Sequence, residues 1–294
     1  MALVSSAFIE VCVDSVQSAI NAAQGGADRL ELCANLGLGG GTTPSLGLLK
    51  AVQRAVNLPI MVMIRPRAGD FLYSEEEVEV MLEDIRIFKE CDVRGVVVGI
   101  LDEDGRVDVE RMKRIVDEAL PLEVCFHRAF DMTRDVDEAL RDIESIGGIS
   151  RILTSGQGKS VLEALPVLES LFRTTKELIE DEPWGLTILP GSGINPQTMG
   201  PILDSLLPLG LQEIHLSGAN WKEGGMLFKR EGMGMGTGGD GEWSALVTDA
   251  QIIREVREIV DARWEQHYSA TGGDVSTIRC SCRRHRTVAS SFVL

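Results

Sequence analysis

The sequence predicts an α/β fold of the (β/α)8, or TIM-barrel, class: a single domain followed by a disordered C-terminal tail. Short apolar, β-rich runs alternate eight times with amphipathic helical stretches, and the connections between them are short. The main rival is a doubly wound open sheet. No Gly-x-Gly-x-x-Gly motif follows the first strand, which argues against the Rossmann form of that rival. We expect the barrel over residues 1–265 and the tail over residues 266–294.

The eight repeated units can be placed individually. The expected strands are Phe8–Val13, Arg29–Cys33, Ile60–Arg65, Gly95–Ile100, Glu123–Phe126, Arg151–Thr154, Leu186–Leu189 and Glu213–Leu216. The expected helices are Ser15–Gln24, Ser45–Ala55, Ser74–Glu90, Val109–Leu120, Val136–Ile146, Val161–Leu178, Pro196–Leu207 and Asp249–Trp264. Ser74 with Glu77 three residues later predicts a capping box at one helix start.

Two segments depart from this rhythm. Residues 220–243 are rich in glycine and methionine, a composition typical of a mobile flap. From residue 266 the sequence is rich in serine, threonine and arginine and loses its apolar periodicity, which predicts disorder.

The overall composition excludes several classes of function. A formal net charge of -16 disfavours nucleic-acid and membrane-surface partners, because an acidic surface repels phosphate. No stretch approaches the ~20 apolar residues of a membrane span. Six cysteines in 294 residues do not resemble a disulfide scaffold, so we expect reduced thiols in the cytoplasm, with a nuclear location left open.

The first two strands place the same residue types in the same setting. Side chains alternate along a strand, and the apolar neighbours face the helices, so Glu10, Cys12, Glu31 and Cys33 should point into the barrel. If equivalent positions lie side by side at ~4.8 Å, Glu10 meets Glu31 and Cys12 meets Cys33. The same alternation in the eighth strand turns His215 and Ser217 inward.

Charged groups inside an apolar tube must be paired, and barrel enzymes place their chemistry at the C-terminal ends of the strands. Glu10, Glu31, Arg65, His127 and Asp131 are therefore candidate catalytic residues. In this interpretation His127 or Glu31 acts as general acid or base and Arg65 holds an anion. The alternative is a structural ion network that closes the barrel.

Two further groups suggest ligands. Thiolates are soft ligands that select Cu(I), but free cysteine is also a common core residue, and spacing alone favours packing for Cys12 and Cys33. The loops after the seventh and eighth strands, "LPGSGI" and "HLSG", often bind phosphate in barrels. Arg65, Gly191, Gly193 and Ser217 are therefore the expected anion-binding residues.

Several motifs closely resemble the CutC copper homeostasis family: "EVCVDS", "GGADRLELC", "TPSLGLL", "MVMIRPRAGDFLYS", "CFHRAFDMTRD", "RILTSG" and "LPGSGI". The resemblance implies a cytoplasmic, homo-oligomeric (β/α)8 barrel, a dimer or a tetramer, with a role in copper homeostasis. It also implies that Cys12 and Cys33 are Cu(I) ligands. The chain departs from the family after the eighth strand, where Gly218-Ala219 replaces an Ala-Arg pair; without that arginine the loop has only backbone contacts to offer an anion.

Three hypotheses follow. The first is a cytosolic copper homeostasis protein that binds Cu(I) through strand-end cysteines. The second is a barrel enzyme acting on a small anionic or phosphorylated metabolite, with an indirect effect on copper. The third is an oligomeric scaffold that binds protein partners.

Overall fold

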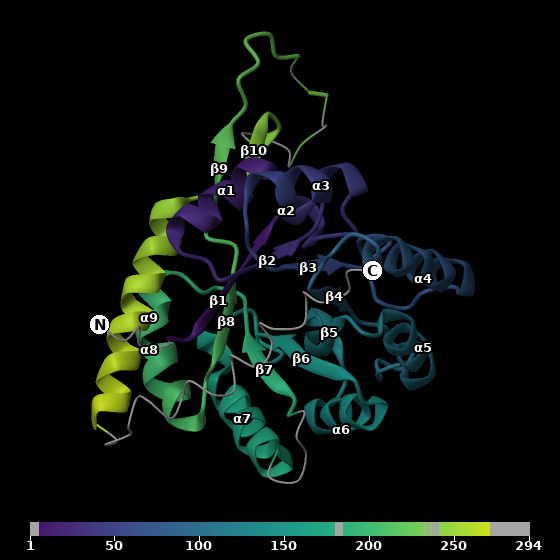
Figure 1. The fold of residues 1–294 in the computed structure, drawn as a ribbon, viewed down its shortest axis with the longest axis vertical. Helices are drawn as coiled ribbons and strands as arrows, with labels where there is room; N and C mark the ends of the chain where they lie inside the picture. The colour runs from purple at the N-terminus through teal and green to yellow at the C-terminus, as the bar shows by residue number, and fades with distance from the viewer. Residues whose placement is uncertain (1–5, 180–184, 231, 234–235, 237–240, 271–294) are drawn as a thin grey trace, which may run out of the picture.

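The computed structural model describes residues 6–179, 185–230, 232–233, 236 and 241–270. Its main sheet has eight strands in the order β7-β6-β5-β4-β3-β2-β1-β8, with parallel pairing along the whole series. A parallel bridge between Gly191 and His215 brings the ends of β7 and β8 together. The strands gather at the centre of Figure 1 with helices around them, which confirms the (β/α)8 barrel.

The predicted elements are present, with small changes at their ends. The strands are β1 (Phe8–Val13), β2 (Arg29–Leu32), β3 (Ile60–Met63), β4 (Gly95–Val98), β5 (Glu123–Phe126), β6 (Ile149–Thr154), β7 (Thr187–Pro190) and β8 (Glu213–Leu216). The helices are α1 (Val16–Gly25), α2 (Leu36–Gly39), α3 (Leu46–Ala55), α4 (Glu75–Lys89), α5 (Val109–Ala119), α6 (Val136–Ile146), α7 (Leu165–Ile179), α8 (Pro196–Leu206) and α9 (Ala250–Ala270), with 3-10 turns η1 (Arg128–Met132), η2 (Leu162–Ala164) and η3 (Leu207–Leu209). The capping box of Ser74 and Glu77 is formed at the start of α4.

Alternation along the strands separates two cores, as the sequence pattern predicts. Ile9 and Val11 of β1 belong to the large core between strands and helices. A smaller apolar cluster fills part of the barrel interior and consists of Met61, Val97, Cys125, Leu153 and Leu189. The free Cys125 is thus a packing residue of the interior.

Ion pairs occupy the N-terminal part of the barrel interior. Arg29 contacts Glu10 at 2.5 Å and Glu213 at 2.6 Å. Arg151 contacts the same Glu213 at 3.0 Å and Glu123 at 2.7 Å. These pairs provide the compensation that buried charges require. The structural ion network weighed from sequence therefore exists, and Glu10 belongs to it.

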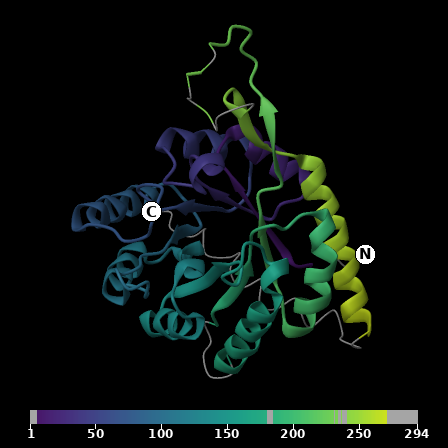
Figure 2. The same cartoon turned by 180° about the vertical axis from the view of Figure 1, so that it is seen from behind.

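The insertion after β8 begins and ends as a hairpin. β9 (Ala219–Glu223) pairs antiparallel with β10 (Ser244–Thr248), and the hairpin projects beyond the barrel in Figures 1 and 2. Trp221 of β9 packs against α2, where a side chain at Gly37 would lie 2.6 Å from the indole ring. This segment is thus part of the barrel's rim, and the mobile flap expected there is anchored by two strands.

The last helix ends later than the sequence pattern predicts. α9 continues past Trp264 to Ala270, and in this last stretch the ring of the buried Trp264 packs on Tyr268 with centroids 4.7 Å apart. The remainder of the expected tail, residues 271–294, lies outside the described residues. None of the helices in the described part of the chain has both the length and the apolar character that crossing a membrane requires.

Candidate metal centre at the barrel mouth

The register of β1 and β2 differs from the expected one. Cys12 pairs with Glu31, and Glu10 pairs with Arg29, so the offset is two residues relative to equivalent positions. Closing a sheet into a barrel staggers neighbouring strands. The observed stagger also sets Glu10 against a cation instead of against the Glu31 carboxylate, which removes a like-charge contact.

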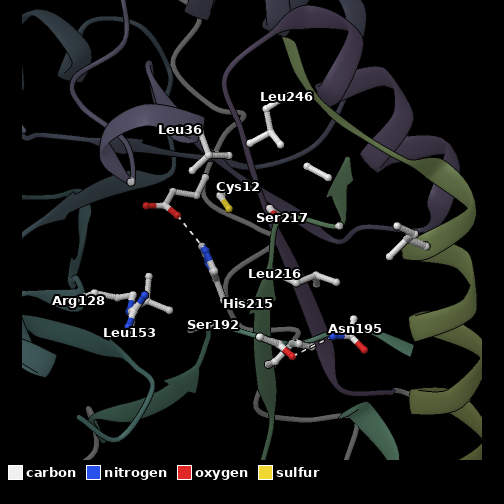
Figure 3. A pocket seen from close by; sticks show the side chains of 18 of the residues that line it. Cys12, Leu36, Arg128, Leu153, Ser192, Asn195, His215, Leu216, Ser217 and Leu246 are labelled. Atoms are coloured by element: carbon white, nitrogen blue, oxygen red, sulfur yellow. Dashed lines mark hydrogen bonds and ion pairs between the residues drawn. The ribbon is translucent and has the colours of Figure 1, made fainter. Parts of the chain in front are cut away.

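His215 connects the two acids from the other side. β8 lies next to β1, and its His215 pairs with Glu10 in register. His215 Nδ1 lies 2.8 Å from Glu10 Oε1, and its Nε2 lies 3.2 Å from Glu31 Oε2. Figure 3 shows His215 and Cys12 side by side at the cavity. The imidazole of His215 thus bridges Glu10 of β1 and Glu31 of β2, a contact that the sequence pattern did not predict.

The surrounding charges determine the protonation of this group. Burial raises the pKa of Glu31, to about 7, and the Glu10 carboxylate acts in the same direction. Burial alone would also raise the pKa of Glu10, but Arg29 and His215 hold it well below its ordinary value. Burial favours neutral His215, but Cys12 and the two acids raise its pKa well above the ordinary value. The raised pKa favours a protonated His215 ring, with Nδ1 hydrogen-bonded to Glu10 and Nε2 at 3.2 Å from Glu31.

The donor set fits a soft transition metal. One ligand atom each from Cys12, Glu31 and His215 lies within 4.8 Å of the other two, and all three residues are buried. Thiolate and imidazole suit copper and zinc, whereas Mg²⁺ and Ca²⁺ prefer oxygen ligands. Burial also raises the pKa of the Cys12 thiol, so metal binding must displace protons from Cys12 and His215. Oε1 of Glu31 is buried without a hydrogen-bond partner.

Cys33 is not part of this group of ligands. It lies one residue beyond β2, is fully buried, and its thiol donates to the carbonyl oxygen of Val13 at 3.6 Å. Its Cβ packs against Gly41, where an added side-chain carbon would lie 3.2 Å away. Burial and the nearby Glu31 raise the pKa of the Cys33 thiol well above its ordinary value. Cys12 and Cys33 are therefore not paired at equivalent positions as expected, because the register of β1 and β2 is offset by two residues.

The five candidate catalytic residues divide into two groups. Glu31, Arg65 and His127 line a cavity of about 760 Å³ at the mouth. Glu10 lies behind His215 in the ion network. Asp131 accepts hydrogen bonds from the hydroxyl of Thr154 and the backbone N–H of Ser155, and so fixes the loop after β6. Glu10 and Asp131 therefore position other groups.

The predicted anion-binding residues have mixed roles. Both terminal nitrogens of Arg65 donate hydrogen bonds to backbone carbonyl oxygens, those of Gly39, Gly41 and Gly69. The Nε of Arg65 makes no hydrogen bond. Gly193 and Ser217 line the cavity. Gly191 instead permits barrel closure, because a side-chain carbon there would lie 2.6 Å from Leu153.

The N-terminus of α8, next to the predicted phosphate loop, is already capped. Asn195 accepts hydrogen bonds from the backbone N–H groups of Gln197 and Thr198 at 2.9 and 3.2 Å. An anion at this helix would have to displace the Asn195 side chain, so the loop offers less to a phosphate than its glycines suggest.

His215 is a candidate metal ligand that the sequence pattern does not single out. Alternation in the eighth strand already turns it inward, but nothing in that pattern shows which inward residue of β1 or β2 it meets. Arg29 was omitted for a similar reason: it begins its strand, and its pairing with Glu10 depends on register. The sequence signal that could have identified this residue is the inward-facing His215 on β8, the strand that closes the barrel against β1.

The fold and the site together define a (β/α)8 barrel protein with a candidate soft-metal site, made of a buried thiol, imidazole and carboxylate, at its mouth. The chain belongs to the CutC family, which it matches over residues 7–220.

Two of its curated relatives carry copper homeostasis names, and others are named as CutC family proteins. The chain is 44% identical to the human and mouse copper homeostasis protein cutC homologs over 252 residues, 85% of this chain and 88% of theirs. It is 40% identical to a CutC family protein of Chromobacterium violaceum, covering 86% of this chain and 98% of the relative. The crystal structure of a CutC protein from Streptococcus agalactiae superposes with a TM-score of 0.63 and 27% identity, covering 72% of this chain and 98% of that one.

Proposed function

We propose that this copper homeostasis family member binds Cu(I) at the barrel mouth, with Cys12 and His215 as the soft ligands and Glu31 beside them. One observation carries the proposal: the three ligand atoms lie within 4.8 Å of one another in a buried setting. Cu(I) accepts low coordination numbers and prefers sulfur and imidazole, so this donor set suits it better than a hard cation.

The surrounding network prepares the ligands. Glu10 holds the His215 ring at 2.8 Å and is itself fixed by Arg29 at 2.5 Å, an arrangement that orients a metal-binding imidazole through its second nitrogen. Glu31 would have to release His215 Nε2, now 3.2 Å away, for the ring to bind a metal. Because the thiol and the imidazolium must lose protons, Cu(I) affinity should rise with pH.

The test is a Cu(I) titration against a competing chromogenic chelator under anaerobic conditions. Cys12→Ser should weaken Cu(I) binding by more than about 100-fold, since even the partners that orient metal ligands are worth 10–100-fold. Cys33→Ser is the matched control: this cysteine is also buried, is two residues beyond Glu31 and lies outside the ligand group. The Cu(I) affinity of Cys33→Ser should stay within about threefold of that of the unmodified chain.

Two outcomes would change the assignment. Equal loss in the two variants would support the two-cysteine ligand set expected from sequence. Unchanged affinity in Cys12→Ser would remove copper from this site altogether.

We also propose that the chain acts in the cytoplasm as a homo-oligomer, a dimer or a tetramer, as its membership of the family suggests. Analytical ultracentrifugation would give the assembly size, and a monomer at micromolar concentration would contradict the proposal. Subcellular fractionation would test the location.

A further inference from the structure

The cavity at the mouth is much larger than a metal ion needs. Its volume of about 760 Å³ falls in the range of roughly 300–1,000 Å³ that is typical of sites for small organic molecules. Apolar side chains form part of its wall, among them Leu36 of α2, Trp221 of β9 and Leu246 of β10. Figure 3 shows Leu36 and Leu246 on the side of the cavity above Cys12. A mixed wall of this kind suits an organic ligand.

A second set of polar groups lines the cavity apart from the candidate metal ligands. The ring of Phe71 packs against His127, with centroids 5.0 Å apart, and against the guanidinium of Arg65, whose central carbon is 4.9 Å from the ring centroid. All three residues line the cavity. Phe71 therefore holds two hydrogen-bond donors in one wall, contributed by the ends of β3 and β5.

The hydrogen bonds fix the tautomer of His127. The backbone N–H of Ala129 donates to His127 Nδ1 at 3.2 Å, so in the neutral ring the proton is on Nε2. Burial and the Arg65 charge lower the pKa of His127 to about 3, which keeps the ring neutral. His127 Nε2 and Arg65 Nε are both buried donors that make no hydrogen bond, and the Tyr73 hydroxyl interacts with the same Arg65 guanidinium.

Glu31 supplies the complementary group. Its Oε1 is a buried acceptor without a partner, while its Oε2 faces His215. Buried polar atoms without partners are few in native proteins, and each calls for an explanation such as a catalytic role or a bound water or ion. Here three of them belong to residues that line one cavity: two donors and one acceptor.

We propose that the mouth binds a small organic carboxylate that carries a hydroxyl group. Its carboxylate oxygens accept hydrogen bonds from His127 Nε2 and Arg65 Nε, and its hydroxyl group donates to Glu31 Oε1. The occupant is therefore a small hydroxycarboxylate. Its donors His127 and Arg65 are outside the ligand group of Cys12, Glu31 and His215, and Glu31 is the one residue that the two sites share.

The experiment is calorimetric titration of the full chain, freed of metal by a chelator, with glycolate, L-lactate and L-malate. Glycolamide, in which an amide replaces the charged carboxylate of glycolate, is the matched ligand control. His127→Phe removes the ring donor, whereas His127→Gln keeps a donor N–H near the position of Nε2. Lys113→Ala on the exposed face of α5 is the control for unspecific effects.

At least one acid should bind the unmodified chain, and glycolamide should bind at least about tenfold more weakly. His127→Phe should lose about tenfold or more in affinity for that acid, while His127→Gln and Lys113→Ala stay within about threefold. Cu(I) affinity should be unchanged in His127→Phe, so failure here and failure of the copper proposal are distinguishable.

Two results would overturn the inference: none of the three acids binds, or His127→Phe binds them as tightly as the unmodified chain. If His127→Phe does not fold, ring signals in carbon-13 NMR spectra of the unmodified chain answer the same question. The His127 signal, assigned by its absence from His127→Gln, should shift on adding the acid; an unmoved signal contradicts the proposal.

Discussion

Replacing Arg29 by methionine tests whether the interior ion network stabilises the barrel. Arg29 is 3% exposed and holds Glu10 at 2.5 Å and Glu213 at 2.6 Å. Methionine fills much of the same volume but leaves Glu10 with His215 as its partner and Glu213 with Arg151. Breaking a buried pair in this way costs about 3–5 kcal/mol, because a desolvated charge loses its compensation.

The measurement is the urea midpoint of unfolding, followed by circular dichroism. Arg86→Met is the matched control, since Arg86 also contacts two carboxylates, those of Glu83 and Glu118, but on the surface. Its midpoint should stay close to that of the unmodified chain, because solvent screens exposed ion pairs. Adding Glu10→Gln to Arg29→Met should recover part of the loss by removing the carboxylate left uncompensated.

Equal midpoints for Arg29→Met and Arg86→Met would refute the reasoning, since burial would then make no difference to an ion pair in this barrel. A double variant less stable than Arg29→Met alone would show that Glu10 is held mainly by His215.

Two further predictions concern the same scaffold. Asp131→Asn should destabilise the chain by about 1–3 kcal/mol, because the amide cannot accept all the hydrogen bonds that Thr154 and Ser155 donate to the carboxylate. The Cu(I) affinity of this variant should equal that of the unmodified chain. A large loss of copper binding would contradict the positioning role of Asp131. Acid should lower the stability of the barrel through Glu123. Burial raises the pKa of this carboxyl, but Arg151 outweighs burial and brings the pKa below the ordinary 4.5. The Glu123 ion pair therefore contributes fully to the free energy of unfolding above pH 4.5, and this contribution is lost as the pH falls further. Urea midpoints measured from about pH 6 to about pH 3 should fall less steeply in Glu123→Gln, and parallel curves would count against this assignment.

The sequence was sufficient for the fold because each unit carries its own signal. Eight apolar runs alternate with helices whose starts are marked, as by Ser74 and Glu77, and this repetition leaves few architectures open. Alternation within β1 also determined that Glu10 and Cys12 face inward, since the period of a strand is two residues whatever its neighbours are.

The register between β1 and β2 could not be predicted from that alternation. A shift of two residues leaves every side chain on the same face, so sequence periodicity cannot distinguish Cys12 beside Cys33 from Cys12 beside Glu31. The shift is set by the stagger of a closing barrel and by the pairing of Glu10 with Arg29.

The sequence by itself therefore determined the barrel, its inward residues and the thiol and acids available at its mouth. Only the tertiary structure decided which of them meet. His215 reaches Glu10 across 205 positions of the chain because β8 closes on β1, and Phe71 brings the ends of β3 and β5 into one wall in the same way. Contacts of this kind depend on how strands close around an axis, which no local pattern in the sequence records.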